Sequence, residues 1–459
     1  MAIIPQRRLF SWDEVENLGD LQRLALVLKA MPDEALMCAL ERERGHGRDD
    51  YPVRAVWNSV LAGIVYQHVS VESLRRELGR NAQLRQLCGF DPLKKAEEAV
   101  PPSWAYTRFL GALMAHQEEL DAIFDELLER LAGELPGFGR HLACDSKGIA
   151  SHARARGEGN YEGLEPDGRR DTDADFGRKT YRGRDKDGTL WEKVVSWFGY
   201  KLHLLVEADY ELPVGYKVTR ASAADNRVAP QLLEDLQSNH PALMERARSL
   251  AADKAYDDSA LHSKLWETYG IAPIIPRRED WKDGELTRPL LEGADNIVYD
   301  IEGRLSCYGP GDGRVHQMVY AGFERERDAQ KWRCPAAVWG LQCRGREDCA
   351  STGSAPRATS RGCANAYGRA VRVKRSKDVR TFCPVARPSP KWERLYKGRS
   401  AVERVNSRLD VSFGFERHFI RGMAKMRLRC GLALAVMLAM ALGRVRQKRR
   451  DLMRSLVAA

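Results

Sequence analysis

The spacing of apolar residues divides the chain into a helical first part and a mixed second part. Over residues 1–135, apolar residues recur at intervals of three and four, which is the period of amphipathic helices. The segments with this period are LGDLQRLALVLKAM, PDEALMCALERERG, PVRAVWNSVLAGIVYQ, SVESLRRELGRNAQLRQL and HQEELDAIFDELLERLAG. Asp33 and Ser70 stand at expected N-cap positions. We predict a helical N-terminal domain over 1–135 that serves either DNA binding or packing and dimerisation.

From residue 140 the pattern changes to short apolar runs and alternation. The segments 197–208 and 212–222 alternate around a turn at 209–211, which is typical of a β-hairpin. RHLACDSKGIA and SLAADKAY predict strands that end at Asp145 and Asp253, and IAPIIP predicts another strand. Helical patterns in VAPQLLEDLQS and SALHSKLWETYG separate these strands. The order predicts a mixed α/β sheet with flanking helices, and we assign 136–280 as the first part of this core.

Two segments interrupt the pattern. Residues 151–196 are rich in Gly, Asp and Arg and predict a loop. Residues 281–390 contain alternating stretches, such as NIVYDIEGRLSCY, and six of the ten cysteines, which predicts an inserted β-rich subdomain. Helical patterns return over 391–410 and in the apolar stretch 430–443. We therefore assign 391–459 as the second part of the core together with basic C-terminal helices.

Charge is distributed unevenly along the chain. The net charge is +10, but residues 369–459 contain 24 Lys and Arg against 6 Asp and Glu, a net of +18. Residues 1–368 then hold 50 basic and 58 acidic residues, a net of −8. Such asymmetry favours a polyanionic partner, most simply nucleic acid, over the alternative of a solvated basic tail.

No targeting segment is predicted. MAIIPQRRLFSWDE has no apolar core before its arginines, so it does not resemble a signal peptide. CGLALAVMLAMALG is shorter than the roughly 20 residues that span a bilayer and predicts a buried helix. We expect a cytoplasmic, DNA-associated protein, whose cysteines are buried or bind metal rather than form disulfides.

Three carboxylates are candidates for a metal centre. Asp145 and Asp253 end predicted strands, where reactive groups of α/β sheets gather, although turn or N-cap roles are the alternative. If 396–410 is one helix, Tyr396, Arg399, Glu403, Ser407 and Asp410 share a face, while Val402, Val405 and Leu409 pack on the sheet. A surface pair of Glu403 with Arg399 would contribute only about 0.3–0.5 kcal/mol. Three such carboxylates could instead hold two Mg²⁺ ions about 3.5–4 Å apart for phosphate chemistry.

The chain resembles insertion-sequence transposases of the cut-and-paste type, which have a DDE catalytic core of RNase H-like fold. ACDSKGI resembles the first-aspartate block, and AADKAYDD, with Tyr256 after Asp253, resembles the second. YKGRSAVERVNSRLD resembles the Y-R-E-K signature, with Tyr396, Arg399 and Glu403 in place. Asp410 stands where that signature expects a basic residue, and Arg408 is an imperfect substitute because it lies about 160° away on an ideal helix.

The resemblance implies that Asp145, Asp253 and Glu403 bind two Mg²⁺ (or Mn²⁺) ions and that Tyr396 and Arg399 contact DNA phosphate. It implies cleavage at the terminal inverted repeats of a transposon, strand transfer into target DNA, and a homodimer in the synaptic complex. Two alternatives remain. One is an RNase H-like nuclease without strand transfer, and the other is a non-catalytic, zinc-stabilised DNA-binding protein.

Other polar residues are weaker candidates. Cys334, Cys343, Cys349 and Cys363 could bind a structural Zn²⁺, although their spacings are not those of a zinc ribbon and free or buried thiols are the alternative. Cys307 and Cys383 lie further out, and we expect core positions for Cys38, Cys88, Cys144 and Cys430. The acidic DTDADFGRKTY predicts a solvated loop, Asp225 a turn or N-cap, and His203 a packed strand residue.

Overall fold

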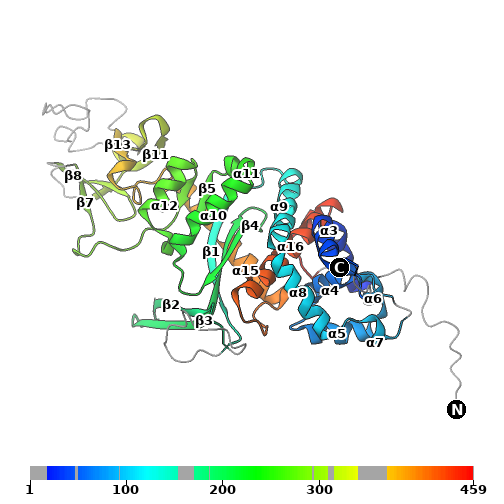
Figure 1. The fold of residues 1–459 in the computed structure, drawn as a ribbon. Helices are drawn as coiled ribbons and strands as arrows, with labels where there is room; N and C mark the ends of the chain where they lie inside the picture. Colours follow the sequence, from blue (N-terminus) through cyan, green and yellow to red (C-terminus); the bar gives the residue numbers. More distant parts are fainter. Residues whose placement is uncertain are drawn as a thin grey trace, which may run out of the picture.

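The computed structural model describes residues 18–46, 50–91, 94–153, 170–185, 187–291, 294–308, 315–339 and 370–457. Figure 1 shows an elongated molecule with the helical part at one end, a sheet in the middle and a smaller β-rich part at the other end. The mixed α/β class and the helical first part, both predicted from the sequence, are confirmed.

Short helices form the first part of the chain. They are α2 (Gln22–Ala30), α3 (Glu34–Arg44), α4 (Val53–Val65), α5 (Val71–Arg80), α6 (Ala82–Cys88), α7 (Ala96–Ala99), α8 (Ser103–Ala115) and α9 (Gln117–Glu134). Ser70 caps α5 as predicted, because its hydroxyl accepts the backbone N–H of Ser73 at 3.2 Å. Asp33 stands at the N-cap position of α3 as predicted, but its buried carboxylate does not cap the helix and instead accepts hydrogen bonds from Trp57 and Arg54.

The central sheet has six strands. They are β1 (His141–Ala150), β2 (Asp175–Arg184), β3 (Leu190–Glu207), β4 (Leu212–Arg220), β5 (Ser249–Ala252) and β6 (Ala272–Ile274). The order is β2-β3-β1-β5-β6, with β4 also paired to β3. β1, β5 and β6 are parallel, whereas β3 is antiparallel to β1, β2 and β4. The predicted mixed sheet is therefore confirmed, with β2 as an additional strand.

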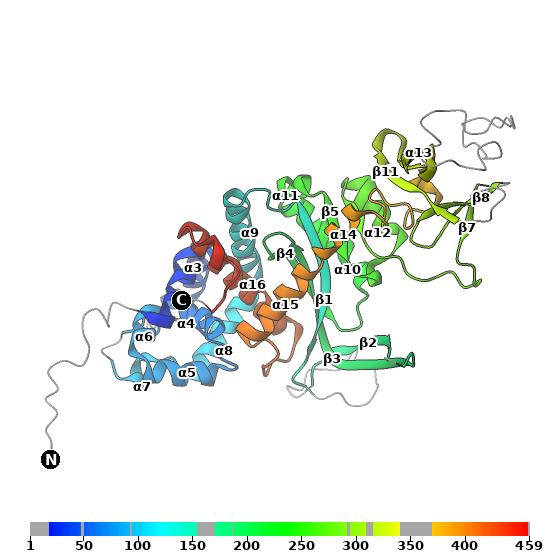
Figure 2. The same ribbon diagram turned by 180° about the vertical axis from the view of Figure 1, so that it is seen from behind.

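Helices cover both faces of this sheet. α10 (Asp225–Asn239) lies on one face, and α14 (Pro390–Lys397) and α15 (Ser400–Phe413) lie on the other, as Figures 1 and 2 show from opposite sides. The predicted helix 396–410 is thus two helices, which meet at Gly398 and Arg399. Val402, Val405 and Leu409 are fully buried as expected, so the apolar stripe of α15 holds it against the sheet.

The long apolar helix α16 (Met423–Arg446) joins the helical part to the sheet. It is longer than the predicted 430–443 and packs against α2, α9 and β4. By length and composition it could cross a membrane, but 89% of its most apolar 18-residue window is buried inside the fold. The prediction of a buried core helix is confirmed.

The prediction of a loop over 151–196 is wrong for its second half. β2 and the first half of β3 form a two-stranded ribbon that extends away from the sheet (Figures 1 and 2). Most ribbon residues between 190 and 196 are exposed, so neither face has the buried apolar alternation by which strands are recognised. The acidic segment before it is not a solvated loop either. Asp171 is buried and accepts hydrogen bonds from the Tyr200 hydroxyl at 2.6 Å and the Gly422 N–H at 3.0 Å.

Residues beyond 281 form two further sheets. One contains β7 (Arg288–Leu291), β8 (Ala294–Tyr299), β9 (Leu305–Tyr308) and β10 (Val315–Gln317), and the other contains β11 (Val319–Glu324), β12 (Ala329–Arg333) and β13 (Ala370–Lys374). They share a small apolar core of their own, which includes Leu305, Trp332 and Phe382. The helix α12 (Ser259–Ser263) of the central part lies nearest to them (Figure 1).

The cysteines divide into several environments. Cys88, Cys144 and Cys430 are buried as predicted, but the prediction for Cys38 is wrong because this residue lies on an exposed face of α3. Of the four candidate zinc ligands, Cys334 is a partly exposed free thiol. Cys343, Cys349 and Cys363 lie outside the described residues.

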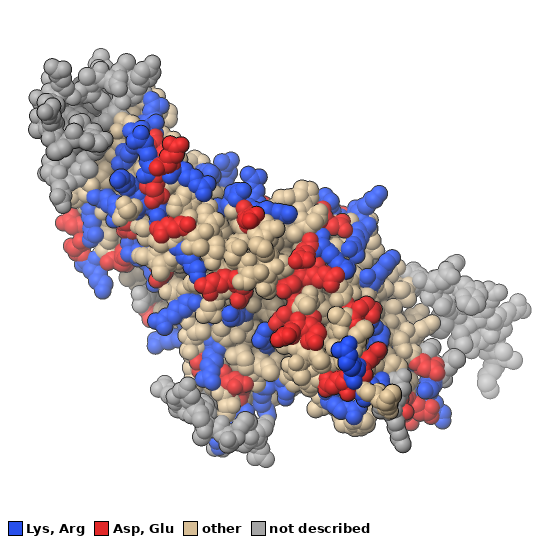
Figure 3. All heavy atoms as spheres, turned by 45° about the horizontal axis from the view of Figure 1, so that its top comes forward, with Lys and Arg blue, Asp and Glu red and all other residues tan. Residues whose placement is uncertain are grey.

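Part of the positive charge of the C-terminal third is neutralised inside the fold. Arg404 and Arg454 both contact Glu211 at 2.8 Å, Arg427 contacts Asp121 at 2.9 Å, and Arg446 contacts Glu134 at 3.5 Å. On the face seen in Figure 3, acidic side chains gather in the middle, and acidic and basic groups are interspersed elsewhere. On this face, the charge asymmetry of the sequence therefore does not produce one uninterrupted basic surface.

Candidate active site

The parallel pairing of β1 and β5 brings Asp145 and Asp253 together. The last paired residues are Cys144 and Ala252, so the two aspartates are the next residue on each of two adjacent strands. Asp145 lies within β1, because this strand continues to Ala150 along β3, and the prediction that Asp145 ends a strand is wrong. Asp253 does end β5. Both therefore lie at the edge where the parallel ladder stops.

Each aspartate is oriented by one backbone hydrogen bond. The Ser146 N–H donates to Asp145 Oδ1 at 2.8 Å, and the Ala255 N–H donates to Asp253 Oδ1 at 2.7 Å. Within the part of the chain that the structure describes, Oδ2 of neither residue accepts a protein hydrogen bond. One oxygen of each carboxylate is thus fixed and the other is available to a ligand.

The electrostatics of Asp145 reflect its burial beside a second carboxylate. Burial and the neighbouring charge of Asp253 together raise its pKa to about 6, although the Ser146 N–H and the charges of Lys179 and Arg399 act to lower it. Lys179 belongs to the β2–β3 ribbon, which the sequence did not predict as structured. Two carboxylates that disfavour each other's ionisation form a site that a divalent cation would stabilise.

The third part of the site is centred on Arg399, which lies between α14 and α15. Its Nη2 lies 2.8 Å from Glu403 Oε1, the i,i+4 pair expected from the sequence. Although partial burial opposes it, the charges of Glu403 and Asp145 raise the pKa of Arg399, so the guanidinium lies near both carboxylates. The Tyr396 ring lies 5.8 Å from the same guanidinium and stacks on Trp392.

Glu403 itself is turned toward Arg399 and its side chain is 54% exposed. In the described residues, no three His, Cys, Asp or Glu side chains converge closely enough to hold a metal ion. The structure therefore brings Asp145 and Asp253 together, whereas Glu403 is paired with Arg399, whose charge also acts on Asp145.

Asp410, the residue that departs from the signature, has a clear partner. Its Oδ2 accepts a hydrogen bond from Lys147 Nζ, and Lys147 also lies 3.3 Å from Glu416. Lys147 is on β1, two residues after Asp145, and so projects from the same side of the strand. Arg408 is not its substitute, because it is bound to the Glu211 carbonyl on the other side of α15. A lysine side chain is thus present near the position where the signature expects a basic residue, but it comes from strand β1 and not from helix α15.

A second polar cluster lies four residues beyond Asp253. Asp257 is fully buried, with Arg277 Nη1 at 3.1 Å, the Arg278 N–H at 2.9 Å and His262 Nε2 at 3.4 Å. His262 Nδ1 in turn lies 3.4 Å from Cys383 Sγ. Although burial alone would raise it, these partners hold the pKa of Asp257 at about 2. This cluster joins the central sheet to the segment after β13, and the sequence did not predict it.

The remaining candidates have structural partners. His203 is buried in β3 and contacts Thr219 at 2.9 Å, as a packed residue would. Asp225 is the first residue of α10 and pairs with Lys201 at 3.2 Å, rather than capping the helix with its side chain.

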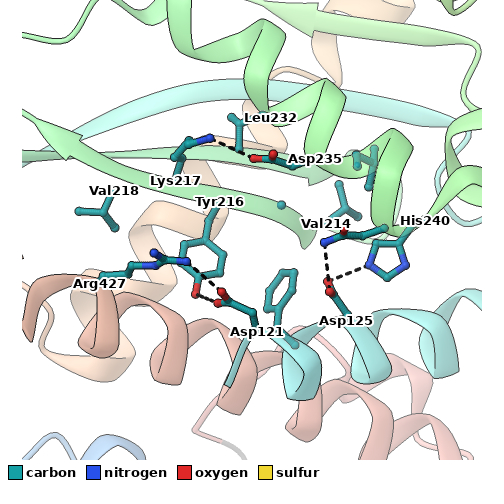
Figure 4. Close-up of a pocket in the computed structure, with 14 residues that line it drawn as sticks. Asp121, Asp125, Val214, Tyr216, Lys217, Val218, Leu232, Asp235, His240 and Arg427 are labelled. Carbon is teal, nitrogen blue, oxygen red and sulfur yellow. Dashed lines mark hydrogen bonds and ion pairs between the residues drawn. The ribbon is translucent and has the colours of Figure 1, made fainter. Parts of the chain in front are cut away.

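A polar pocket of about 410 Å³ lies away from the carboxylates, between α9, β4, α10 and α16 (Figure 4). Arg427 contacts Asp121 at 2.9 Å, His240 contacts Asp125 at 2.9 Å and Lys217 contacts Asp235 at 3.2 Å. Each cation is matched by a carboxylate, so the pocket has no excess positive charge for a phosphate group.

The family model for the transposase DDE domain matches residues 136–439, more than half of the chain. The chain belongs to the DDE transposase family. It is a DNA transposase, whose substrate is DNA, and transposases of this family generally depend on divalent metal ions.

One solved structure is also similar to this transposase. A cryo-EM structure of the piggyBac transposase synaptic complex with hairpin DNA is similar at a TM-score of 0.37 and 10% identity, over 96% of this chain and 79% of that one. No curated protein matches the chain.

Proposed function

We propose that Asp145, Asp253 and Glu403 are the catalytic carboxylates of this transposase and that they bind two Mg²⁺ or Mn²⁺ ions. The observation that carries the proposal is the register of β1 and β5, because it sets two aspartates side by side, each with one free oxygen. Carboxylate oxygens are the ligands that these hard cations prefer. Glu403 completes the set once it leaves Arg399.

The strand order supports an RNase H-like core. Strands β1 to β6 without β2 follow the order β4-β3-β1-β5-β6, with β3 antiparallel to its neighbours and the last three strands parallel. We assign residues 136–280 and 391–459 to this core, 281–390 to an insertion and 1–135 to DNA-end binding.

Arg399 has two roles in the proposed mechanism. Without metal, its guanidinium neutralises Glu403 and lies near Asp145. When DNA enters, a phosphate can replace Glu403 as the partner of Arg399, which frees the glutamate to become a ligand. Tyr396 stands beside it as a second phosphate contact.

The reaction consists of two phosphoryl transfers. The bound divalent ions supply Lewis acidity that lowers the pKa of water and stabilises the negative charge on the phosphate. In the first transfer, water attacks the phosphorus at the transposon end, the P–O3′ bond breaks, and a 3′-hydroxyl and a 5′-phosphate result. In the second transfer, this 3′-hydroxyl attacks a phosphodiester of target DNA, which forms the joint and releases a target 3′-hydroxyl. Asp145, Asp253 and Glu403 would hold the ions, and Arg399 and Tyr396 would contact and orient the phosphate.

Removal of each carboxylate tests this proposal. Asp145→Asn, Asp253→Asn and Glu403→Gln should each abolish nicking of a supercoiled plasmid that carries the ends of the element, in Mg²⁺. DNA binding, measured by gel shift in Ca²⁺, should persist. Glu393→Gln is a matched control, because Glu393 lies on α14 and, among the described residues, forms its ion pair with exposed Lys397. Normal cleavage by any one of the three variants would remove that residue from the triad.

Two other activities would give different results. A nuclease would nick the plasmid but would not join a labelled 3′ end to target DNA, whereas a non-catalytic binding protein would do neither. Zinc at Cys334, Cys343, Cys349 and Cys363 stays a separate prediction, and metal analysis of the purified protein tests it. We also propose that a homodimer holds two terminal inverted repeats in the synaptic complex.

A further inference from the structure

The β2–β3 ribbon, residues 175–199, concentrates exposed apolar side chains. Five of the twelve large apolar residues that are exposed in the described part of the chain lie in it: Phe176, Leu190, Trp191, Val194 and Val195. Figures 1 and 2 show the ribbon projecting beyond the helices that cover the sheet. A two-stranded ribbon without a core behind it is marginally stable in water, so exposure of this kind marks a surface that binds something.

Two tryptophans on one face of the ribbon lie flat on glycines of the neighbouring strand. Trp191 is paired with Gly183, and a Cβ atom built at Gly183 would lie 2.5 Å from the indole. Trp197 is paired with Gly177, whose Cβ would lie 2.4 Å from that indole. Glycine at these positions lets each ring rest on backbone. Because Trp191 is still 41% exposed, one face of its ring is supported and the rest is open.

The chemistry between these rings fits nucleic acid. Trp191 and Trp197 are six residues apart and therefore share a face, and the pair Lys179–Val195 lies between them on that face. Lys193 and Lys179 place cations among the apolar groups, while Asp185, Asp187 and Glu192 gather toward the tip. Flat aromatic rings between cations are what single-stranded DNA binds, through base stacking and phosphate contacts.

The ribbon also reaches the catalytic carboxylates. Trp197 packs on Gly148 of β1, three residues after Asp145, since a Cβ atom at Gly148 would lie 2.7 Å from its indole. The base of the ribbon therefore adjoins the strand that carries Asp145, and the charge of Lys179 acts on this carboxylate. Val195, opposite Lys179, is four residues from Trp191, which corresponds to about 13 Å along a strand. At roughly 3.4 Å per nucleotide, this distance is about four nucleotides of a stacked strand.

We propose that the β2–β3 ribbon binds the DNA strand that leaves the active site, and that Trp191 stacks on an unpaired base about four nucleotides from the phosphate nearest Lys179. The inference rests on the proposed function, since it takes Asp145 as the site of the cut. The ribbon is then a surface for unpaired DNA, and duplex DNA alone does not engage Trp191.

The test measures binding separately from cleavage. Full-length protein with Asp145→Asn, in Ca²⁺, is titrated against a fluorescent 30-base-pair duplex that ends in an eight-nucleotide single-stranded thymine tail, and against the same duplex with a blunt end. Trp191→Ala should weaken binding of the tailed duplex by about tenfold, as expected for one lost stacking contact, and binding of the blunt duplex by less than about twofold. Trp191→Phe should restore most of the loss because a stacking ring remains.

Trp339→Ala is the matched control, since Trp339 is an exposed tryptophan in the β-rich part of the chain. Equal affinities of Trp191→Ala and Trp339→Ala for the tailed duplex would overturn the proposal. So would a change of oligomeric state in sedimentation without a change in DNA affinity, because the ribbon would then be a protein interface. If the tail preference depends on Trp191 but the wild-type protein fails to cleave in Mg²⁺, the proposed function fails while the ribbon surface stands.

Discussion

Asp253 and Asp257 lie four residues apart in one sequence block, yet they occupy opposite kinds of site. Asp253 follows β5 at the open edge of the sheet, with one oxygen held by a backbone N–H and the other free. Asp257 is completely buried and meets Arg277, His262 and the Arg278 N–H. The first is prepared for a ligand that is not protein, and the charge of the second is already balanced by cations of the fold.

The difference shows what separates a functional carboxylate from a structural one. Burying a charge is tolerated only when partners within the fold replace the lost water, and Asp257 meets this condition. Asp145 does not, since its neighbour is another carboxylate and its pKa is raised to about 6. A carboxylate beside another carboxylate at the end of a parallel ladder therefore indicates chemistry, whereas a buried carboxylate beside cations of the fold indicates stability.

The largest effect that would sharpen this comparison is on catalysis. Asp253→Asn should reduce the rate of plasmid nicking at least about a thousandfold, equivalent to ~4 kcal/mol of transition-state stabilisation, because a metal ligand is lost. The temperature of thermal unfolding should be unchanged or slightly higher. A nicking rate within tenfold of wild type would show that Asp253 belongs to the structural class.

Asp257→Ala should have the opposite outcome. It leaves Arg277 and His262 buried without their carboxylate, and we expect a loss of about 3–5 kcal/mol in the free energy of unfolding. Because the pKa of Asp257 is lowered to about 2, its contribution is present above about pH 4 and is lost as the pH falls through 2. Urea unfolding at pH 7 measures this loss in the free energy of unfolding, and the same measurement at pH 3 measures its pH dependence. Asp258→Ala, at the cap of α12, is the control and should cost only ~1 kcal/mol.

Asp145→Asn should stabilise the metal-free protein. The raised pKa means that the folded state binds the proton more tightly than the unfolded state. The stabilisation of the folded state by protonated Asp145 is therefore full below about pH 4 and is lost as the pH rises through about 6. At pH 7.5 in EDTA we expect a gain of about 2 kcal/mol, which disappears at pH 4. Unfolding curves that coincide at both pH values would contradict this account of the open edge.

The smallest effect concerns Lys147 and Asp410. Lys147→Ala should weaken DNA binding by about one phosphate contact, so the slope of log affinity against log salt falls by ~0.9. A double-mutant cycle with Asp410→Asn should give a coupling of about 1 kcal/mol for folding, as expected for a partly exposed pair. Lys201→Ala, which removes a lysine on the opposite face of the sheet, should leave the salt slope unchanged.

The sequence predicted much of this fold because periodicity and strand order are local signals. The stripe of Val402, Val405 and Leu409 faces the sheet as expected, and the alternation over 197–208 is strand β3. The β2–β3 ribbon was missed because neither of its faces is buried. The sequence also predicted a site of three carboxylates on three separate elements, and this stays a prediction.

Long-range partners explain what could not be predicted. Asp410 stands where the signature expects a basic residue of the helix. The positive charge near this position comes instead from its partner Lys147, which is 263 positions away on β1. Asp171 was expected in solvent because the groups that donate hydrogen bonds to it, on Tyr200 and Gly422, are remote in sequence. Cys38 has apolar neighbours in the sequence but lies on the exposed side of α3.

The burial of α16 has a consequence for synthesis of the chain. This helix packs against α2 and α9, so these two helices have no complete core until residues 423–446 have been synthesised. Incomplete chains would expose Leu24 and Val27, which are fully buried in the finished molecule. Because folding of the two ends depends on a contact between them, truncated products cannot retain a stable helical part. Premature termination anywhere before α16 should therefore yield material for proteolysis rather than a competing DNA-binding fragment.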